Sequence, residues 1–283
     1  MLFLVTSCDD EDTRARRGFT GAGRWAIYQA DMTVGQIAIL SALMVATGAL
    51  GAITGGNSLI NVPLMIMVGM SPRQAVATNM FAVIFMTVSA TARFARARML
   101  RMELLLPLGL ITVATSAYGA RLAVKLPETV VKLVVGISMA VVVVFIAVYR
   151  KNAAPVAPTR AHRWWGYVGT TLLGVYGGFF SGGYTTLMTV LCTVCFGLTM
   201  MESVAVTKPI NLLSCVAASA VYFAYGLIDL RIGVPLAAAN LVGGWLGAHA
   251  ALKGGDRFVR LLFLGTVAAL ALKLLVWDLI LRR

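Results

Sequence analysis

An uncharged apolar run from Val34 to Met70 constrains this chain more than any other feature of its sequence. A bilayer core of about 30 Å is crossed by about 20 helical residues, so the run is too long for one simple span. Its interior holds a single glycine-rich polar stretch, Thr54-Gly55-Gly56-Asn57-Ser58. The sequence therefore predicts a helix that is interrupted at this stretch inside a membrane.

The composition is that of a membrane protein. Of the 283 residues, 59% are hydrophobic and 12% are charged, whereas soluble domains carry about 25% charged residues. The charged residues stand in short clusters between long apolar segments. A transmembrane barrel would instead show short segments of alternating polarity. We therefore expect an all-α polytopic integral membrane protein.

The second half of the chain repeats the pattern of the first half. Gly182-Gly183 follows Gly55-Gly56 at an offset of 127 positions. Further pairs at offsets of 128 to 130 are Gly69 with Gly197, Thr78 with Thr207, Arg101 with Arg231, Pro107 with Pro235, and Gly136 with Gly265. This spacing predicts two homologous repeats of about four transmembrane helices, each with a Gly-interrupted helix or a short re-entrant segment. Matched interruptions of this kind are typical of transporter binding sites.

The predicted organisation has four parts. Residues 1–32 read as a mobile N-terminal tail, residues 33–150 as the first membrane repeat, residues 151–163 as a basic linker and residues 164–283 as the second membrane repeat. Within the first repeat, Ser71 and Pro72 fit the N-cap and the first position of a new helix.

Charge suggests a topology. Cytosolic loops of membrane proteins are rich in Arg and Lys. We expect the arginines of the tail, the cluster Arg93–Arg101 and the linker to lie in the cytosol, with a cytosolic N-terminus, in the bacterial cytoplasmic (inner) membrane. This requires one net crossing by Val34–Gly69 and gives eight crossings in total. If the short apolar pieces cross fully, each half has five crossings and the repeats are inverted.

The two interruptions predict an anion site. A helix that begins in mid-membrane presents free N–H groups and a partial positive charge, and glycines let an anion approach that backbone. The predicted substrate-binding residues are Gly55, Gly56, Asn57, Ser58, Thr78, Asn79, Gly182, Gly183, Tyr184, Thr185, Thr186, Thr207, Lys208 and Asn211. The alternative is that glycines and hydroxyl residues only let the helices pack closely.

Lys208 is the sharpest single candidate, because it lies inside the apolar run Val204–Tyr225. A lysine at the centre of a bilayer costs about 2.5–3.5 kcal/mol on insertion scales. Either it faces a wet cavity and attracts the anion, or its long side chain snorkels to the membrane surface. Arg121 and His249 are matched residues near predicted span ends and are secondary candidates.

These motifs resemble the sulfite exporter TauE/SafE family, also called the toluenesulfonate uptake permeases. The resemblance covers about residues 33–280 and rests on Gly51-x-x-x-Gly-Gly-Asn-Ser-Leu-x-x-Val-Pro63, Gly69-Met-Ser-Pro, Ala75-Val-Ala-Thr78 and Gly178-x-x-Ser-Gly-Gly183. It implies a membrane exporter or permease for small sulfur-containing anions such as sulfite, sulfoacetate or other organosulfonates. The chain departs from the family pattern at Asn57, Tyr184 and Lys208-Pro209, where the substrate would bind.

Other classes of function fit less well. The nearest acidic residues, Glu202 and Asp229, stand at the margins of predicted spans, so no carboxylate relay is expected. The sequence has no phosphate-binding loop and no metal-spaced cluster, and we expect neither an enzyme, a cofactor, a metal nor a nucleic-acid partner. The expected partners are a small anion and the lipid bilayer, and a homodimer stays open. Two alternatives stay open: a membrane-bound sulfur-compound enzyme or assembly subunit that uses Cys192 and Cys195, and a permease for a different anion.

Overall fold

The computed structural model describes residues 33–131, 133–134, 136–137 and 159–281, and the regular elements among them are helices. The described helices include α2 (Val34–Thr54), α3 (Ser58–Met67), α4 (Pro72–Arg96), α5 (Met102–Lys125), α7 (Arg160–Phe179), α8 (Tyr184–Phe196), α9 (Met200–Ala224) and α10 (Leu230–Leu281). At Gly255 the backbone of α10 leaves the helical region, with φ 67° and ψ −171°, so two helical pieces meet there. The all-α prediction is confirmed for these residues. The predicted tail, most of the last span of the first half and residues 151–158 of the predicted linker lie outside them.

Four of the described helices, α2, α4, α5 and α9, are long and apolar enough to cross a membrane. The start of α4 follows the local prediction. The hydroxyl of Ser71 accepts the N–H of Gln74 at 3.4 Å, and Pro72 occupies the first helical position. This capping satisfies a backbone donor that the first turn of a helix cannot satisfy itself.

Helices α2, α4 and α10 run in the same direction. Small residues on α10 let its backbone approach both partners, and the contacts advance together along each pair of helices. The contacts that fix the directions are those of Gly243 with Val45, Gly247 with Ala49, Gly233 with Phe81, and Gly244 with Met86. We refer to these three helices as the first trio.

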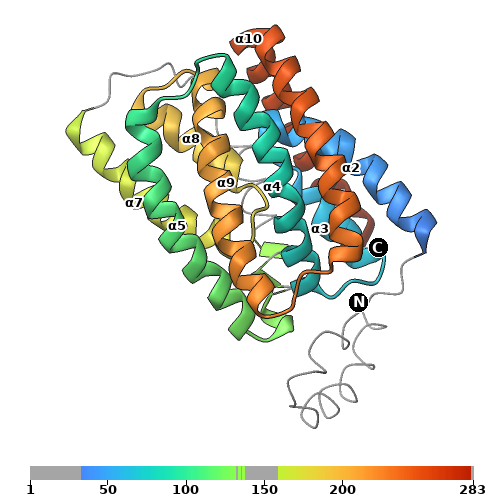
Figure 1. The fold of residues 1–283 in the computed structure, drawn as a ribbon. Coiled ribbons are helices and arrows are strands. Elements are labelled where there is room, and N and C mark those ends of the chain that lie inside the picture. The colour runs from blue at the N-terminus through green and yellow to red at the C-terminus, as the bar shows by residue number, and fades with distance from the viewer. Residues whose placement is uncertain (1–32, 132, 135, 138–158, 282–283) are drawn as a thin grey trace. The chain divides into compact units, whose positions relative to one another are not determined.

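Helices α5, α7 and α9 form a second trio that runs in the opposite direction. Within this trio the advancing contacts are those of Gly174 with Thr112, Gly178 with Ser116, Arg101 with Glu202, and Ser116 with Ser214. Between the trios α4 packs against α9, with Met80 beside Cys215 and Phe94 beside Met201, which is an antiparallel pairing. Figure 1 shows α5 and α7 on one side of the α4–α9 pair and α2 and α10 on the other side.

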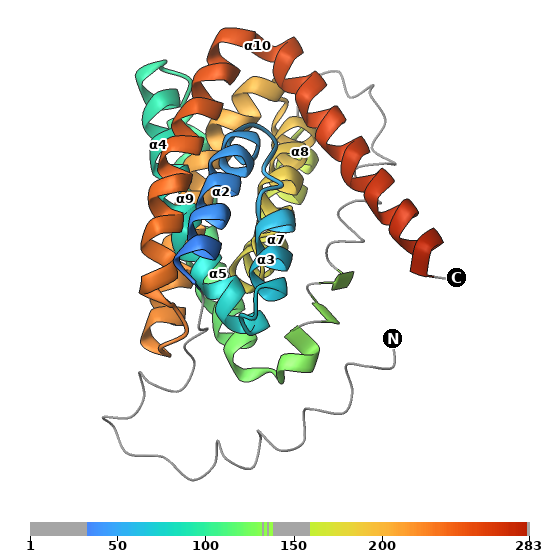
Figure 2. The same ribbon diagram turned by 90° about the vertical axis from the view of Figure 1, so that its right-hand side faces the viewer.

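Helix α3 turns back along α2. Thr47 on α2 donates a hydrogen bond to Asn61 on α3, with 2.8 Å between the two side-chain oxygens, and Gly51 lies against the side chain of Asn57. These pairs converge on the residues around Gly55, where the chain reverses. Figure 2 shows α2 and α3 side by side. We call this pair of helices hairpin 1.

Helix α8 turns back along α7 in the same way. Gly169 on α7 lies against Leu191 on α8, and Gly177 lies against the ring of Tyr184, so these contacts converge on residues 180–183. We call α7 and α8 hairpin 2. Because their first helices belong to oppositely directed trios, the two hairpins enter the bundle from opposite ends.

This arrangement corrects one prediction from the sequence. Since α2 and α4 run in the same direction, they begin at the same end of the bundle, and the segment Val34–Gly69 makes no net crossing. The expectation of one net crossing is wrong. The direction of a short apolar helix depends on the glycine contacts that fix α2 and α4 against α10, and its own sequence does not carry that information.

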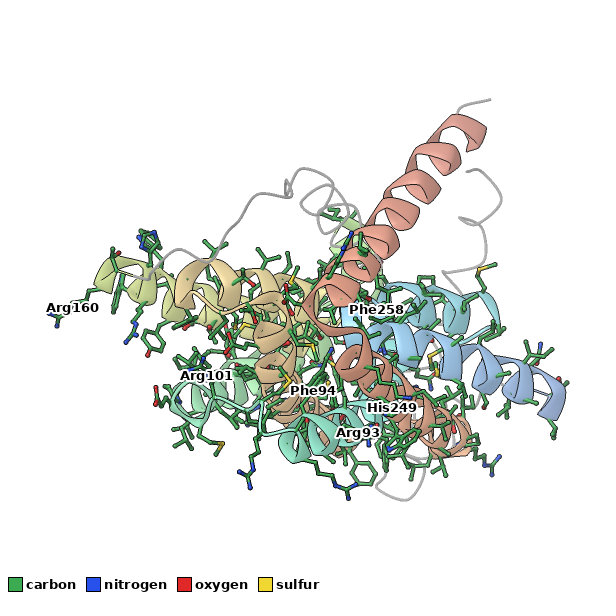
Figure 3. The ribbon with its side chains drawn as sticks, turned by 90° about the horizontal axis from the view of Figure 1, so that it is seen from above. Arg93, Phe94, Arg101, Arg160, His249 and Phe258 are labelled. Carbon is green, nitrogen blue, oxygen red and sulfur yellow. The ribbon has the colours of Figure 1, made fainter. Side chains whose placement is uncertain are left out.

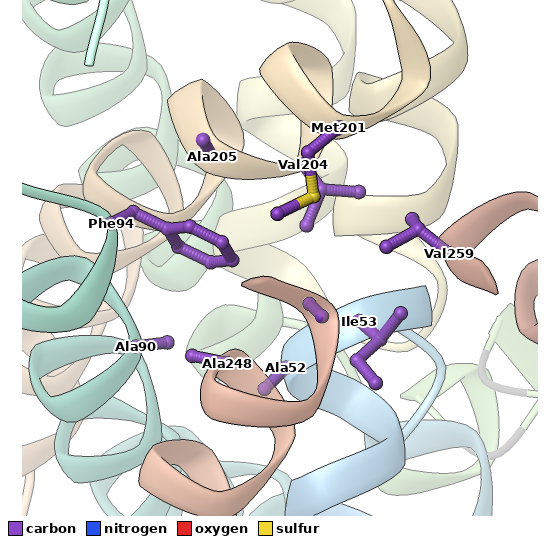
Figure 4. Packing of buried hydrophobic residues seen from close by; sticks show 10 residues of the cluster. Ala52, Ile53, Ala90, Phe94, Met201, Val204, Ala205, Ala248 and Val259 are labelled. Atoms are coloured by element: carbon purple, nitrogen blue, oxygen red, sulfur yellow. The ribbon is translucent and has the colours of Figure 1, made fainter. Parts of the chain in front are cut away.

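An apolar core joins the first trio to α9. It consists of Ala52, Ile53, Ala90, Phe94, Met201, Val204, Ala205, Ala248, Ala251 and Val259. Figure 4 shows these side chains converging from α2, α4, α9 and α10. A second core contains Leu108, Met188, Cys192, Cys195, Phe196, Leu198, Val206 and Ile210 and joins hairpin 2 to α5 and α9. Apolar packing therefore holds hairpin 1, through α2, against α4, α10 and α9, and holds hairpin 2, through α8, against α5 and α9.

Candidate functional site

The tips of the two hairpins meet inside the bundle. The hydroxyl oxygens of Ser58 and Ser181 lie 2.8 Å apart, and the hydroxyl of Thr186 donates to the backbone carbonyl of Thr54 at 2.6 Å. All four residues are buried. We call this region the tip contact. It joins segments that are more than a hundred positions apart in the chain.

Glycines are required where the tips touch. Gly55 has φ 81°, and a Cβ built on it would lie 2.6 Å from the Cβ of Thr185. Gly183, at the start of α8, has φ 76°. A Cβ on Gly182 would lie 2.3 Å from the ring of Phe180. Any other residue type would add strain or push the two tips apart.

Both α3 and α8 begin at the tip contact, and each begins with unpaired backbone donors. The first N–H groups of any α-helix lack an intrahelical acceptor. Within the described part of the chain, the N–H groups of Asn57 and Ser58 in hairpin 1 find no acceptor, nor do those of Thr185 and Thr186 in hairpin 2. Two sets of N–H groups therefore lie close together, each at the positive end of a helix dipole.

Helix α4 supplies further polar groups to the tip contact. The side-chain amide of Asn79 donates to the hydroxyl of Ser58 at 2.9 Å. The amide of Asn57 points to the sulfur of Met86 at 3.4 Å. Thr78 accepts the backbone N–H of Asp229 at 3.2 Å, so it contacts the start of α10 instead. Of the two predicted site residues on α4, Asn79 is thus the one that contacts the hairpin tips.

Several buried polar atoms around the tips have no partner among the described residues. They include the amide nitrogen of Asn61 and the carbonyl oxygen of Asn79. A buried polar group without a hydrogen bond costs about 1–3 kcal/mol. Such groups are satisfied by water or by a bound ligand, so the region is suited to hold one.

Lys208 lies fully buried beside hairpin 1. Its ammonium group donates to the carbonyl of Gly51 at 2.9 Å, and the same carbonyl accepts the N–H of Gly55 at 2.9 Å. The snorkelling alternative is wrong, because the side chain has no exposed surface. Of all the residues described as buried, Lys208 is the one with a basic or acidic side chain of the Lys, Arg, Asp or Glu type.

Two predicted site residues of α9 lie close to Lys208. One contacts hairpin 2, and the other contacts a residue of α9. The hydroxyl of Thr207 lies 3.3 Å from that of Thr189 on α8. Asn211, one turn further on, accepts a weak hydrogen bond from the thiol of Cys215 at 3.6 Å. Helix α9 therefore contacts both hairpins within a single turn.

Thr54, Ser181 and Gly51 were missed by sequence reasoning. Thr54 and Ser181 each stand directly before a Gly-Gly pair, at the same offset of 127 positions. That matched pair of hydroxyl residues was a readable signal. The role of Gly51 lies in its carbonyl, which no residue pattern reveals.

The secondary candidates lie away from the tip contact. Arg121 is exposed. His249 accepts a hydrogen bond at Nδ1 from the guanidinium of Arg93 and stacks on the ring of Trp245, with ring centroids 5.4 Å apart. Figure 3 shows Arg93 and His249 together at the end of α4. These residues organise the end of the bundle.

The described cysteines are buried in the bundle and belong to no metal-binding group. Cys192, Cys195 and Cys215 are free and buried, and the first two pack in the second apolar core. Within the described ranges, no group of three or more His, Cys, Asp or Glu side chains could hold a metal ion. The geometry therefore gives the thiols a packing role.

Comparison with known proteins gives a consistent set of similarities. A family model described as "Sulfite exporter TauE/SafE" matches residues 40–274. The chain is 26% identical over 250 residues to a probable membrane transporter protein, ORF9, of Sinorhizobium sp, covering 87% of this chain and 94% of that protein. It is 25% identical over 231 residues to a probable membrane transporter protein of Haemophilus influenzae, covering 81% and 91%. It is 23% identical over 246 residues to the probable membrane transporter protein YfcA of Escherichia coli K12, covering 84% and 89%. No solved structure matches the chain.

Proposed function

The chain belongs to the sulfite exporter TauE/SafE family of membrane transporters, and from this premise we propose that it moves small sulfur-containing anions across the bacterial cytoplasmic membrane. The proposed substrates are sulfite, sulfoacetate or other organosulfonates. The observation that carries the proposal is the meeting of two helix starts with unpaired N–H groups in the interior of the bundle.

The chemistry of this place favours an anion. Each helix start is equivalent to a partial positive charge of about half an elementary charge. The hydroxyls of Ser58 and Ser181 and the amide of Asn79 add neutral polar groups, and Lys208 adds a basic side chain that is hydrogen-bonded to the carbonyl of Gly51. A sulfonate or sulfite group presents several oxygens that require converging donors of this kind.

The opposite directions of the two trios support an inverted repeat. We propose that the first and second halves are equivalent units related by a pseudo-two-fold axis, with the anion site where their hairpins meet. In such a pair, opening one hairpin exposes the site to one side of the membrane, and opening the other exposes it to the opposite side. The exchange of α5 and α10 between the halves would keep the trios together during this movement.

The orientation follows from the cationic ends of the helices. Among the residues that the structure describes, more arginine and lysine residues lie at the end where α4 finishes and α9 begins than at the other end. Those residues are Arg93, Arg96, Arg98, Arg101, Arg160, Arg163, Lys253 and Arg257. We propose that this arginine end faces the cytosol. Because α2 begins at the opposite end, this orientation puts Val34 on the outer side and replaces the expectation of a cytosolic start.

The proposed direction is export or facilitated permeation. A monoanion leaves an inside-negative cell with a gain of about 2.3 kcal/mol per 100 mV, so no coupling ion is needed. In the described residues no carboxylate is buried beside the tip contact to carry a proton or a sodium ion. A coupled uptake would require such a group or a set of carbonyl ligands.

Flux measurements in proteoliposomes test the proposed function. The full chain is reconstituted, the membrane potential is set with a potassium gradient and valinomycin, and efflux of sulfite, sulfoacetate, methanesulfonate and sulfate is followed. We expect potential-dependent flux of at least one sulfur anion, absent from empty liposomes. Ser58→Ala should reduce this flux, whereas Thr171→Ala on the exposed face of α7 should not. Flux of none of these anions above the empty-liposome level would contradict the proposal.

A further inference from the structure

We propose that the site selects anions with a single negative charge over dianions, because one lysine ammonium is the only formal charge that the described residues bury beside the tip contact. The inference rests on the proposed function and deepens it. It narrows the proposed substrates to monovalent sulfur oxyanions, such as alkyl sulfonates and hydrogen sulfite, and disfavours dianions, which include sulfate, the sulfite dianion and sulfoacetate.

The first step is the inventory of charge near the tips. Lys208 is fully buried, and its described hydrogen-bond partner is the neutral carbonyl of Gly51. The nearest acidic residue on the same helix is Glu202, which lies about 9 Å along the axis at six positions distance. Its carboxylate is paired with Arg101 at 2.6 Å and accepts the N–H of Thr199 at 3.0 Å.

The other carboxylates near the helix ends are also engaged. Asp256 accepts the N–H of Met201 at 2.9 Å, at the start of α9. Asp229 accepts the N–H of Arg231 at 2.9 Å, at the start of α10. For the residues that the structure describes, the ammonium of Lys208 has no carboxylate within 4.0 Å. Its charge is therefore uncompensated by the protein near it.

The second hairpin shows that the charge is unnecessary for holding a hairpin. Gly178 stands in α7 at an offset of 127 from Gly51 in α2. Its carbonyl is bound by the neutral hydroxyl of Tyr222 at 3.0 Å, where the carbonyl of Gly51 is bound by Lys208. Both donors come from α9. A neutral donor thus performs the same backbone function, so the positive charge of Lys208 calls for a different explanation.

Charge balance supplies that explanation. A buried charge without a counter-ion is strongly disfavoured, and a buried pair of opposite charges is tolerated when its hydrogen bonds are complete. A monoanion at the tip contact leaves the loaded site neutral. A dianion leaves one net negative charge, because the hydroxyl groups carry no charge and each positive helix start is matched by the negative end of the same helix, so neither adds net charge to the loaded site. The site should therefore discriminate by valence among anions of similar size.

A competition assay tests this inference with the wild-type chain. Proteoliposomes take up labelled methanesulfonate by counterflow, and unlabelled ethanesulfonate, ethane-1,2-disulfonate and sulfate compete. We expect the monoanion to inhibit at a concentration at least about tenfold lower than either dianion. Sulfate and methanesulfonate are tetrahedral groups of similar size, so this pair changes valence with little change in size. Ethane-1,2-disulfonate is larger than ethanesulfonate by one sulfonate group and serves as a second dianion of different size.

A variant pair adds a second readout. Lys208→Met should lower methanesulfonate counterflow by about tenfold or more, and Lys208→Arg should restore part of it, since charge is retained. Lys253→Met, which removes an exposed lysine of α10, is the matched control. Equal or better competition by the dianions would overturn the valence inference and leave the proposed function standing. Absence of flux for every anion would overturn both.

Discussion

Hairpin 1 and hairpin 2 perform the same backbone task with different side chains. Each ends its first helix near a Gly-Gly pair, and each has a carbonyl of that helix held by α9. The donor is the cation Lys208 for hairpin 1 and the neutral Tyr222 for hairpin 2. The residue after the Gly-Gly pair is Asn57 in one and Tyr184 in the other. The comparison shows that both hairpins use glycines at the tip and a donor from α9 on a backbone carbonyl. The side chains at the two tips differ, and we expect them to define the ligand.

The largest expected effect on stability concerns the close helix crossing that each hairpin makes, α7 with α5 and α2 with α10. Gly178 packs on α5 and Gly247 packs on α2, and a Cβ added at these positions would lie 2.0 Å from the carbonyl of Ser116 and 2.1 Å from that of Ala49. Gly178→Val and Gly247→Val should each destabilise the protein by about 3 kcal/mol or more through overpacking. Thermal unfolding of the purified variants measures this.

The control for these variants is Gly35→Ala near the start of α2, where the nearest atom to an added Cβ lies 4.0 Å away. Its melting temperature should stay close to that of the wild type. If only one of the two valine variants is destabilised, the two helix crossings are not equivalent. The comparison of hairpin 1 with hairpin 2 would then be contradicted.

The next effect distinguishes Lys208 from Tyr222, the two α9 side chains that donate to a backbone carbonyl of a hairpin. Lys208→Met should reduce anion flux by about tenfold or more, because the charge of the site is lost. Tyr222→Phe leaves the carbonyls of Gly178 and Phe179 without their donor and should cost about 1–3 kcal/mol of stability, with flux largely retained. Flux in proteoliposomes and melting temperature are measured for both. Equal loss of flux in the two variants would show that the charge has no special role.

A smaller effect measures the link between the tips. The hydroxyls of Ser58 and Ser181 share one hydrogen bond, so Ser58→Ala and Ser181→Ala should not be additive. A double-mutant cycle on unfolding free energy should give a coupling of about 0.5–1.5 kcal/mol. Thr171→Ala combined with Ser58→Ala serves as the uncoupled control. Additive effects of the two serine variants would show that the tips are not energetically coupled.

The smallest expected effect on anion flux concerns hairpin 2 and the competing enzyme hypothesis. Cys192→Ala with Cys195→Ala removes two buried thiols that pack against Leu108 and Met188. Anion flux should remain near the wild-type value, while stability falls by about 1 kcal/mol per site from lost packing. Loss of flux in a folded double variant would favour the reading in which these thiols handle a sulfur compound.

Much of the local structure could be predicted from the sequence, because it depends on neighbouring residues. Ser71 and Pro72 mark the start of α4 through capping chemistry that spans three positions. The helical class follows from the long apolar segments, and the family followed from the order of the glycine motifs. In each case the deciding interaction lies within one element or in the composition.

What could not be predicted depends on long-range contacts. The return of α3 along α2 depends on α10, whose Gly243 and Gly247 meet α2 nearly 200 positions earlier in the chain. The pairing of Ser58 with Ser181 depends on how two hairpins approach from opposite ends. The loop-charge rule led to a net crossing because it weighs charges and cannot detect a reversal inside an uncharged run.

The central claim is that a monovalent anion binds where α3 and α8 begin. A structure of the full chain in lipid nanodiscs with saturating methanesulfonate tests it most directly. The account predicts density for one sulfonate group within hydrogen-bonding distance of the N–H groups of Ser58 and Thr185, with the ammonium of Lys208 turned toward it. A sulfonate bound elsewhere, or hairpin tips separated by lipid or by continuous helix, would contradict the account.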